Sequence, residues 1–210
     1  MANILVFGAS IAQGYYDTEG GWADRLKRYF IQEELKHNWE QSINVFNLAL
    51  SGDTSKDVLS RISKETKQRI WSNHKLIFIF EIGTNDSIII NGKPKVPLSE
   101  FRKNLNQLLK FCKTYSDKII FLGLTPVDEP RVTPMTWSPS ESYLSERIKK
   151  YNDEVKVFSH RNNLGFVDLH REFTKVDFKK NLHDGVHPNS QGHKKIFEIV
   201  RDFLVKEKLI

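Results

Sequence analysis

The sequence has a single cysteine, few glycines and prolines, and no long apolar run. Cys112 alone cannot form an intrachain disulfide or a zinc cluster, and it lies in an apolar helical pattern, so we expect a buried thiol rather than a reactive one. No apolar run approaches the roughly 20 residues that span a bilayer. The segment Met1–Gly8 has no basic residue and only four strongly apolar residues in a row, unlike a signal peptide. We therefore expect a cytoplasmic protein.

The composition excludes a disordered or fibrous chain. Glycine and proline contribute only 11 and 7 residues, hydrophobic residues make up 39%, and charged residues 28%. A soluble globular protein has about 25% charged residues. A chain of 210 residues can bury roughly 70% of its unfolded surface, so its core needs neither disulfides nor a structural metal. We expect residues 1–210 to form a single domain.

The formal net charge is +6, and all of it comes from residues 101–210. In that half the basic residues alternate with acids, as where Glu146 precedes Lys149 and Lys150, which is typical of a solvated helix face. No zinc-finger, RNA-recognition or basic-zipper pattern accompanies the charge. We expect no nucleic-acid partner. The alternative, a DNA-binding C-terminal half, predicts an affinity that falls steeply with salt.

Short apolar runs alternate with longer stretches of helical periodicity along the whole sequence. The apolar runs predict five strands, at Ile4–Phe7, Ile43–Leu48, Leu76–Ile82, Lys118–Leu124 and Gly165–Leu169. The periodic stretches predict helices at Trp22–Lys36, Ser55–Ile70, Ser99–Tyr115, Ser140–His160 and Ser190–Lys208. This alternation predicts an α/β fold with a parallel sheet covered by helices on both sides, and reactive groups outside the carboxyl ends of the strands.

One long stretch without periodicity, Thr125–Pro139, follows the fourth expected strand and holds four of the seven prolines. Irregular segments of this length often serve as binding loops or lids. We expect it to overhang the crevice, where Met135 and Trp137 would give an apolar wall and Arg131 a cation for the substrate. Alternatively, Trp137 only anchors the loop to the core.

Ser10 lies just beyond the first expected strand, between small residues that permit a tight turn. There it could present its hydroxyl and backbone N–H to the crevice, although most serines at such places cap a helix or a turn. The segment matches neither the phosphate-loop nor the G-x-G-x-x-G pattern. Tyr15, Tyr16, Asp17 and Trp22 follow closely and are candidates to line a pocket.

The segment His183–Pro188 makes a catalytic role for Ser10 more plausible. Asp184 precedes His187 by three residues in an expected loop, so its carboxylate could hold one ring nitrogen and leave the other free to take a proton. A competing reading is a zinc site, because His183 and His187 have i, i+4 spacing. That reading needs a helix, which Gly185 and Pro188 disfavour.

Two further strand-end segments, Asn47–Thr54 and Gly83–Asp86, carry glycines and an asparagine. Each alone would fit a plain turn or a helix cap. Both should reach the same sheet edge as Ser10, where the N–H of Gly52 and the side chain of Asn85 could point at one oxygen. Acyl transfer needs such donors, and losing one typically costs about 10²–10³ in rate.

These segments together resemble the SGNH hydrolase superfamily, also called GDSL esterases and lipases, in four blocks and in order. Gly8-Ala9-Ser10 resembles block I, Gly52 within Asn47–Thr54 block II, Gly83-Thr84-Asn85-Asp86 block III, and Asp184-Gly185-Val186-His187-Pro188 block V. The resemblance implies a flavodoxin-like three-layer α/β/α sandwich, which agrees with the alternation described above.

By that resemblance Ser10 would be the nucleophile, His187 the base and Asp184 its orienting acid. Ser10 N–H, Gly52 N–H and the Asn85 side chain would form the oxyanion hole. The implied activity is hydrolysis of a small-molecule carboxylic ester through an acyl-enzyme, which requires no metal or other cofactor. The positions of Tyr15, Arg131 and Trp137 in the sequence make them the substrate-binding candidates. Lipids, acetylated sugars, small esters and thioesters all remain open as substrates.

The chain departs from the family at Ala9, where an aspartate is usual, so hydrogen bonding around the nucleophile turn must differ. A second interpretation of the whole set is a non-catalytic carbohydrate- or nucleotide-binding domain on the same fold.

Overall fold

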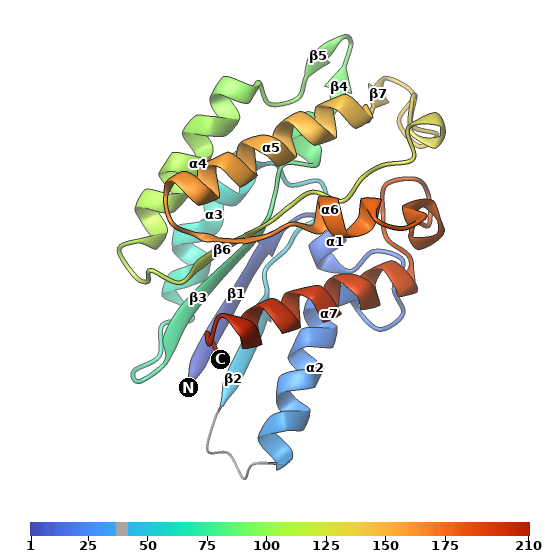
Figure 1. Ribbon diagram of the computed structural model, residues 1–210. Coiled ribbons are helices and arrows are strands. Elements are labelled where there is room, and N and C mark those ends of the chain that lie inside the picture. The colour runs from blue at the N-terminus through green and yellow to red at the C-terminus, as the bar shows by residue number, and fades with distance from the viewer. Residues whose placement is uncertain (37–41) are drawn as a thin grey trace.

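The computed structural model describes residues 1–36 and 42–210, and its centre is a five-stranded parallel sheet (Figure 1). The strand order is β2-β1-β3-β6-β8. The strands are β1 (Ala2–Gly8), β2 (Ile43–Asn47), β3 (Lys75–Glu81), β6 (Ile119–Leu122) and β8 (Gly165–Val167). Each of the five expected strands is thus confirmed, with bounds shifted by up to two residues.

The central strands are buried on both faces, which explains their continuous apolar sequences. In β1, Leu5 and Phe7 belong to one hydrophobic cluster, whereas Ile4 and Val6 belong to the other. Alternate residues of a strand point to opposite faces, so a run without polar residues supplies two cores at once. The result is a three-layer α/β/α sandwich.

Five long helices cover the two faces of the sheet. On the face that carries Phe7 lie α3 (Ser55–Lys67), α4 (Leu98–Cys112) and α5 (Ser145–Arg161), and on the other lie α2 (Gly21–Lys36) and α7 (Ser190–Lys206). Their apolar residues face the sheet, as in α7, where Ile196, Val200 and Leu204 are buried at helical spacing. Cys112 is buried at the end of α4, as expected, and burial raises the pKa of its thiol.

One expected helix, Ser140–His160, begins later than the sequence pattern indicates. Residues Glu141 and Ser142 form strand β7 instead, which pairs antiparallel with β4 (Ile89–Ile90), and β4 pairs with β5 (Lys93–Pro94). Two-residue strands are too short to produce a periodic sequence signal, so this three-stranded sheet was not foreseen. Figure 1 shows it beyond the carboxyl ends of the main strands, opposite both chain termini.

Short helical segments complete the fold. They are the helices α1 (Ser10–Gln13) and α6 (Leu169–Thr174) and the 3₁₀ turns η1 (Asn85–Ser87), η2 (Glu129–Arg131) and η3 (Phe178–Asn181). Two of them, α1 and η1, begin just after β1 and β3 and carry Ser10 and Asn85 to the same sheet edge. In the described part of the chain, no helix is long and apolar enough to cross a membrane.

Candidate active site

Ser10 is the first residue of α1, directly after the turn that ends β1. The turn requires glycine at position 8, because a Cβ there would lie 2.7 Å from the Cβ of Ala12 and 2.8 Å from the carbonyl oxygen of Glu81. Ala9 occupies the N-cap position, and its methyl group cannot accept a hydrogen bond. The close fit between β1, α1 and β3 nevertheless fixes the direction in which Ser10 leaves the sheet.

The imidazole of His187 lies between the side chains of Ser10 and Asp184. Its Nε2 is 2.8 Å from Ser10 Oγ, and its Nδ1 is 2.7 Å from Asp184 Oδ2. Because an ionised carboxylate can only accept, Nδ1 carries the proton when the ring is neutral, and Nε2 then accepts the hydrogen bond of the serine hydroxyl. Residues 177 positions apart in the sequence are thereby placed in one hydrogen-bonded chain.

Asp184 is held in its ionised form by three hydrogen bonds. Burial by itself would raise the pKa of its carboxyl, but the His187 side chain and the backbone N–H groups of His187 and Val186 lower that pKa to about 2. Oδ1 accepts both N–H groups, at 3.0 Å from Val186 and 2.9 Å from His187. The segment turns tightly at Gly185, with φ +103°, and is not the helix that the zinc interpretation required.

Two further elements bring hydrogen-bond donors toward Ser10. Asn85 opens η1, and its Nδ2 donates one hydrogen to the carbonyl of Asp53 at 2.9 Å, which leaves its second hydrogen available. Gly52 lies in the turn before α3 with φ +85°, a left-handed conformation that favours glycine. In residues 1–36 and 42–210, neither the N–H of Gly52 nor that of Ser10 has a hydrogen-bond partner.

The buried carboxyl of Asp86 links the segment of Asn85 to the segment that follows Gly52 through hydrogen bonds. It accepts the Ser55 N–H at 3.0 Å and the Ser55 hydroxyl, and Asn104 donates to that same hydroxyl at 2.9 Å. Burial raises the pKa of Asp86 to about 6, although the hydrogen bonds from Ser55 favour the charged form. Asp86 therefore fixes the start of α3, and with it the Gly52 turn, against η1.

A cavity of about 310 Å³ opens in front of these groups. Ser10, Gly52, Asn85, Asp184 and His187 line it together with Tyr15, Tyr16, Ser51, Ile88, Lys95, Met135, Trp137, Glu141 and Tyr143. The loop Thr125–Pro139 therefore reaches the cavity through Met135 and Trp137. The expected substrate cation, Arg131, does not line this cavity. Its guanidinium instead donates to the carbonyl of His183 at 2.7 Å, in the loop that carries His187.

Three exposed aromatic rings surround the mouth of the cavity. Ring centroids of Tyr15 and Trp137 lie 5.7 Å and 6.2 Å from that of His187. Tyr16 stacks on His183 with centroids 4.0 Å apart, and its φ of +61° is unusual for a bulky residue. Such rings provide flat apolar surfaces beside the reacting groups.

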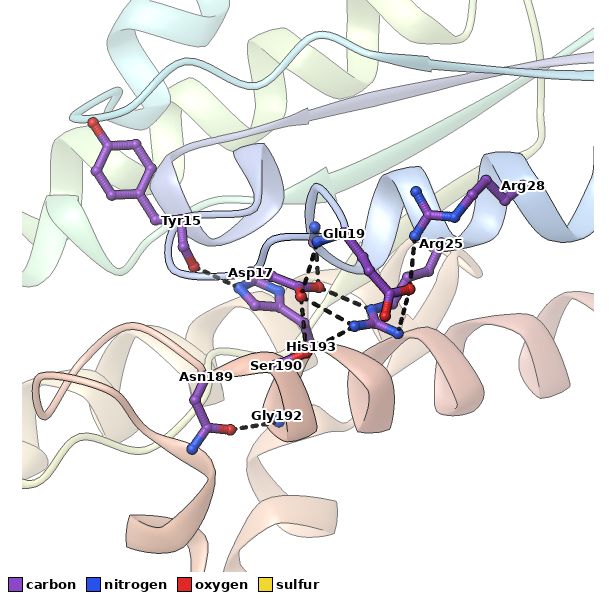
Figure 2. A network of polar contacts seen from close by, with 10 residues as sticks. Tyr15, Asp17, Glu19, Arg25, Arg28, Asn189, Ser190, Gly192 and His193 are labelled. Atoms are coloured by element: carbon purple, nitrogen blue, oxygen red, sulfur yellow. Dashed lines mark hydrogen bonds and ion pairs between the residues drawn. The ribbon is translucent and has the colours of Figure 1, made fainter.

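A polar network built around a buried ion pair connects the segment after Ser10 to α2 and to α7, the helix that follows His187 (Figure 2). Asp17 accepts two hydrogen bonds from Arg25, at 2.9 and 3.0 Å, and one from the Ser190 hydroxyl at 2.9 Å. His193, also on α7, contributes its Nε2, 2.9 Å from the carbonyl of Tyr15. The network holds Tyr15 and the end of α1 against α7, and so helps to set the position of Ser10 relative to His187.

Glu81 is the last residue of β3 and lies beside Gly8 in the sheet. Its carboxyl is buried, and Oε2 has no hydrogen-bond partner among the described residues. Burial raises its pKa to about 8, despite the partly offsetting effects of the Trp22 indole and the Ala12 N–H. Burial thus favours the neutral form of Glu81, whereas the carboxyl that hydrogen-bonds His187 is that of Asp184.

Several of these residues escaped the sequence analysis. Tyr143 was placed inside an expected helix. The pairing of Arg25 with Asp17, eight residues earlier, depends on the conformation of the turn that leads into α2. Glu81 could have been noticed in the sequence, because it is an acidic residue inside an apolar run. Within residues 1–36 and 42–210, no group of three or more His, Cys, Asp or Glu side chains is arranged to hold a metal ion.

Comparison with curated proteins identifies relatives that extend over nearly the whole chain. An isoamyl acetate-hydrolyzing esterase from Saccharomyces cerevisiae is 25% identical, covering 96% of this chain and 84% of its own length. An acetylxylan esterase from Xylanibacter ruminicola is 26% identical over a shorter stretch, 59% of this chain and 27% of its own length.

Solved structures reproduce the fold. A lipase/acylhydrolase from Enterococcus faecalis superimposes with a TM-score of 0.77 at 22% identity, covering 97% of this chain and 95% of that one. An acetylxylan esterase from Geobacillus stearothermophilus gives a TM-score of 0.73 at 19% identity, covering 97% and 94%.

The family model for the GDSL-like lipase/acylhydrolase family matches residues 4–200. This match includes every segment that carries a side chain or N–H group of the site described above. The chain belongs to the GDSL-like lipase/acylhydrolase family.

Proposed function

We propose that this protein is a serine esterase that cleaves carboxylic esters through an acyl-enzyme, with residues 1–210 acting as one catalytic domain. The observation that carries the proposal is the unbroken chain from Ser10 Oγ to His187 Nε2 at 2.8 Å and from His187 Nδ1 to Asp184 Oδ2 at 2.7 Å. A binding domain would have no need of a hydroxyl hydrogen-bonded to a base whose other nitrogen is held by a carboxylate.

The reaction proceeds in two similar halves. His187 takes the proton of Ser10 as the Ser10 oxygen forms a bond to the ester carbonyl carbon, and the imidazolium then protonates the departing alcohol. A water molecule enters, gives a proton to His187 and attacks the acyl carbon; the bond from that carbon to Ser10 Oγ then breaks, and the imidazolium returns the proton to Ser10 as the acid leaves. Asp184 remains ionised throughout and stabilises the imidazolium.

Negative charge develops on the carbonyl oxygen in each tetrahedral intermediate. We assign its stabilisation to the N–H groups of Ser10 and Gly52 and to the free hydrogen of Asn85 Nδ2. Each of these groups lines the cavity with Ser10, and each has a hydrogen without a partner in the described residues. Donors fixed before the reaction need no reorganisation when the charge appears.

The substrate class that best fits the site is an ester with a short acyl chain. The cavity of about 310 Å³ lies at the small end of the usual range for ligand pockets, about 300–1,000 Å³. Tyr15, Tyr16 and Trp137 offer their rings to the rest of the substrate at the open side. Two relatives are named for acetate esters, isoamyl acetate and acetylated xylan, which supports the same class.

Turnover of a series of 4-nitrophenyl esters from acetate to dodecanoate, with an acetylated sugar alongside, tests the proposal. We expect kcat/KM to be highest for the shortest acyl chains and Ser10→Ala to lose at least about 10³ of the rate. Near-wild-type turnover by Ser10→Ala would overturn the mechanism, whereas a rate that rises with chain length would overturn only the substrate class.

A further inference from the structure

Tyr143 is a buried tyrosine that lines the cavity and contacts Asn85. Its hydroxyl donates a hydrogen bond to Asn85 Oδ1 at 2.8 Å. Burial raises the pKa of Tyr143, which favours the protonated hydroxyl that donates this hydrogen bond. We propose that Tyr143 is a positioning residue for catalysis, whose hydroxyl holds the Asn85 amide with its N–H side toward Ser10. This inference rests on the proposed esterase function.

The two ends of the Asn85 amide have different partners, and the difference fixes its orientation. Asn85 Nδ2 faces the carbonyl of Asp53 at 2.9 Å, and Oδ1 faces the hydroxyl of Tyr143 at 2.8 Å. A rotation of the amide by 180° would bring Oδ1 against the Asp53 carbonyl, where neither oxygen has a hydrogen to donate. Tyr143 could still accept from the rotated amide, but its own hydrogen would then lose its partner.

Without the tyrosine hydroxyl, the Asp53 carbonyl alone would hold the amide. Asn85 Oδ1 would then be buried without a hydrogen-bond donor. A rotation of the amide that brought Oδ1 to another donor would turn Nδ2 away from the position of the oxyanion. Leaving a buried acceptor unsatisfied costs about 1–3 kcal/mol. The hydrogen bond from Tyr143 also withdraws electron density from the amide, which makes Nδ2–H a stronger donor as negative charge forms on the substrate.

The irregular segment before α5 delivers Tyr143 to this place. The Tyr143 N–H donates to the carbonyl of Val132 at 3.1 Å, and the Thr133 hydroxyl donates to the carbonyl of Tyr143 at 2.7 Å. Strand β7 precedes Tyr143 directly and pairs with β4, which follows η1 in the chain. Backbone contacts therefore hold Tyr143 to the loop over the cavity, and the pairing of β7 with β4 holds it to the segment that follows Asn85.

The test is a double-mutant cycle between Tyr143→Phe and Asn85→Ala, with 4-nitrophenyl acetate as substrate. Tyr143→Phe keeps the ring and removes only the hydroxyl, so we expect kcat to fall about tenfold with KM within about twofold. Asn85→Ala should lower kcat by about 10²–10³. Adding Tyr143→Phe to Asn85→Ala should then cost less than about twofold, because the amide that the hydroxyl positions is already absent.

Tyr151→Phe is the matched control, because Tyr151 is also buried, its hydroxyl donates to the carbonyl of Val96, and neither residue lines the cavity. We expect this variant to lose thermal stability while kcat stays within about twofold. A kcat for Tyr143→Phe that equals the wild-type value, or a tenfold loss that persists undiminished in the Asn85→Ala background, would overturn the inference.

A second measurement does not depend on the folding of any variant. In a crystal structure of the wild-type protein with a phosphonate bound to Ser10, we expect Asn85 Nδ2 within about 3.2 Å of the phosphonyl oxygen, and Tyr143 Oη within the same distance of Oδ1. A hydroxyl turned to another acceptor would overturn the role of Tyr143. Turnover that is equal in wild type and Ser10→Ala would instead show that the proposed function itself has failed.

Discussion

Arg25 binds Asp17 through two nitrogens, Nε at 2.9 Å and Nη2 at 3.0 Å, in a pair whose carboxylate is fully buried and whose guanidinium is 12% exposed. Burial alone would raise the pKa of Asp17, but the hydrogen bonds from Arg25 and Ser190 lower it to about 2. The pair joins the segment after Ser10 to α2, and the Ser190 hydroxyl, which contacts both partners, connects it to α7, the helix after His187. The geometry between nucleophile and base therefore depends on an interaction outside the cavity.

Replacing Arg25 by leucine should destabilise the protein strongly. It leaves a buried carboxylate without its cation, a change that typically costs about 3–5 kcal/mol of the free energy of unfolding. Arg28→Ala is the control, because Arg28 pairs with the exposed Glu19 on the surface and such pairs contribute about 0–1 kcal/mol. Urea unfolding of both variants measures the difference. Equal losses would contradict a structural role for the Arg25 pair.

Asp184→Asn should lower kcat by about 10³–10⁴ without a comparable change in KM. An asparagine side chain in this place can donate to Nδ1, which would shift the ring proton to Nε2 and remove the acceptor for the Ser10 hydroxyl. The stability effect should follow pH. Because the folded-state pKa of about 2 lies below the ordinary 3.8, Asp184 stabilises the fold above about pH 4 and loses that contribution as pH falls toward 2.

Steady-state kinetics and acid unfolding of Asp184→Asn check the two parts separately. A variant that keeps kcat would remove Asp184 from the catalytic set. An acid-unfolding profile as steep as that of the wild type would contradict the account of its ionised, hydrogen-bonded state.

Glu81 should make the protein less stable as pH rises. The pKa of its carboxyl is about 8 in the folded protein and ordinarily 4.5, so between these values the unfolded state has released the proton and the folded state has kept it. Stability therefore declines from about pH 4.5 to about pH 8 and levels off above that. Glu81→Gln should flatten this decline and melt at a higher temperature than the wild type at pH 8. An unchanged pH slope of the melting temperature in Glu81→Gln would show that another group causes it.

The fold could be predicted from the sequence because the main strands are buried on both faces. That burial leaves unbroken apolar runs such as Leu76–Ile82, and a parallel sheet then brings their carboxyl ends to one edge. Ser10 and His187 could be found because each lies in a short segment with turn-forming residues. The distance between their side chains depends on tertiary packing, so it could not be derived from the sequence.

The groups around the site were harder to predict, since their roles depend on contacts between distant segments. Tyr143 lies between β7 and α5, where two residues of strand interrupt a helix-like pattern. Arg131 looked like a substrate cation because it lies in the loop over the cavity, but its side chain points to the His183 carbonyl. Ala9 has no side-chain acceptor, and the tight contacts at Gly8 fix the turn there instead.

The central claim is that the oxygen of Ser10 becomes a nucleophile through His187. It is tested most directly by reacting the protein with a fluorophosphonate and mapping the adduct by peptide mass spectrometry. The account predicts one adduct, on Ser10, that forms at least about 10³ times more slowly in His187→Ala and is absent in Ser10→Ala. An unlabelled Ser10 in the folded wild-type protein, or labelling at the same rate without His187, would contradict it.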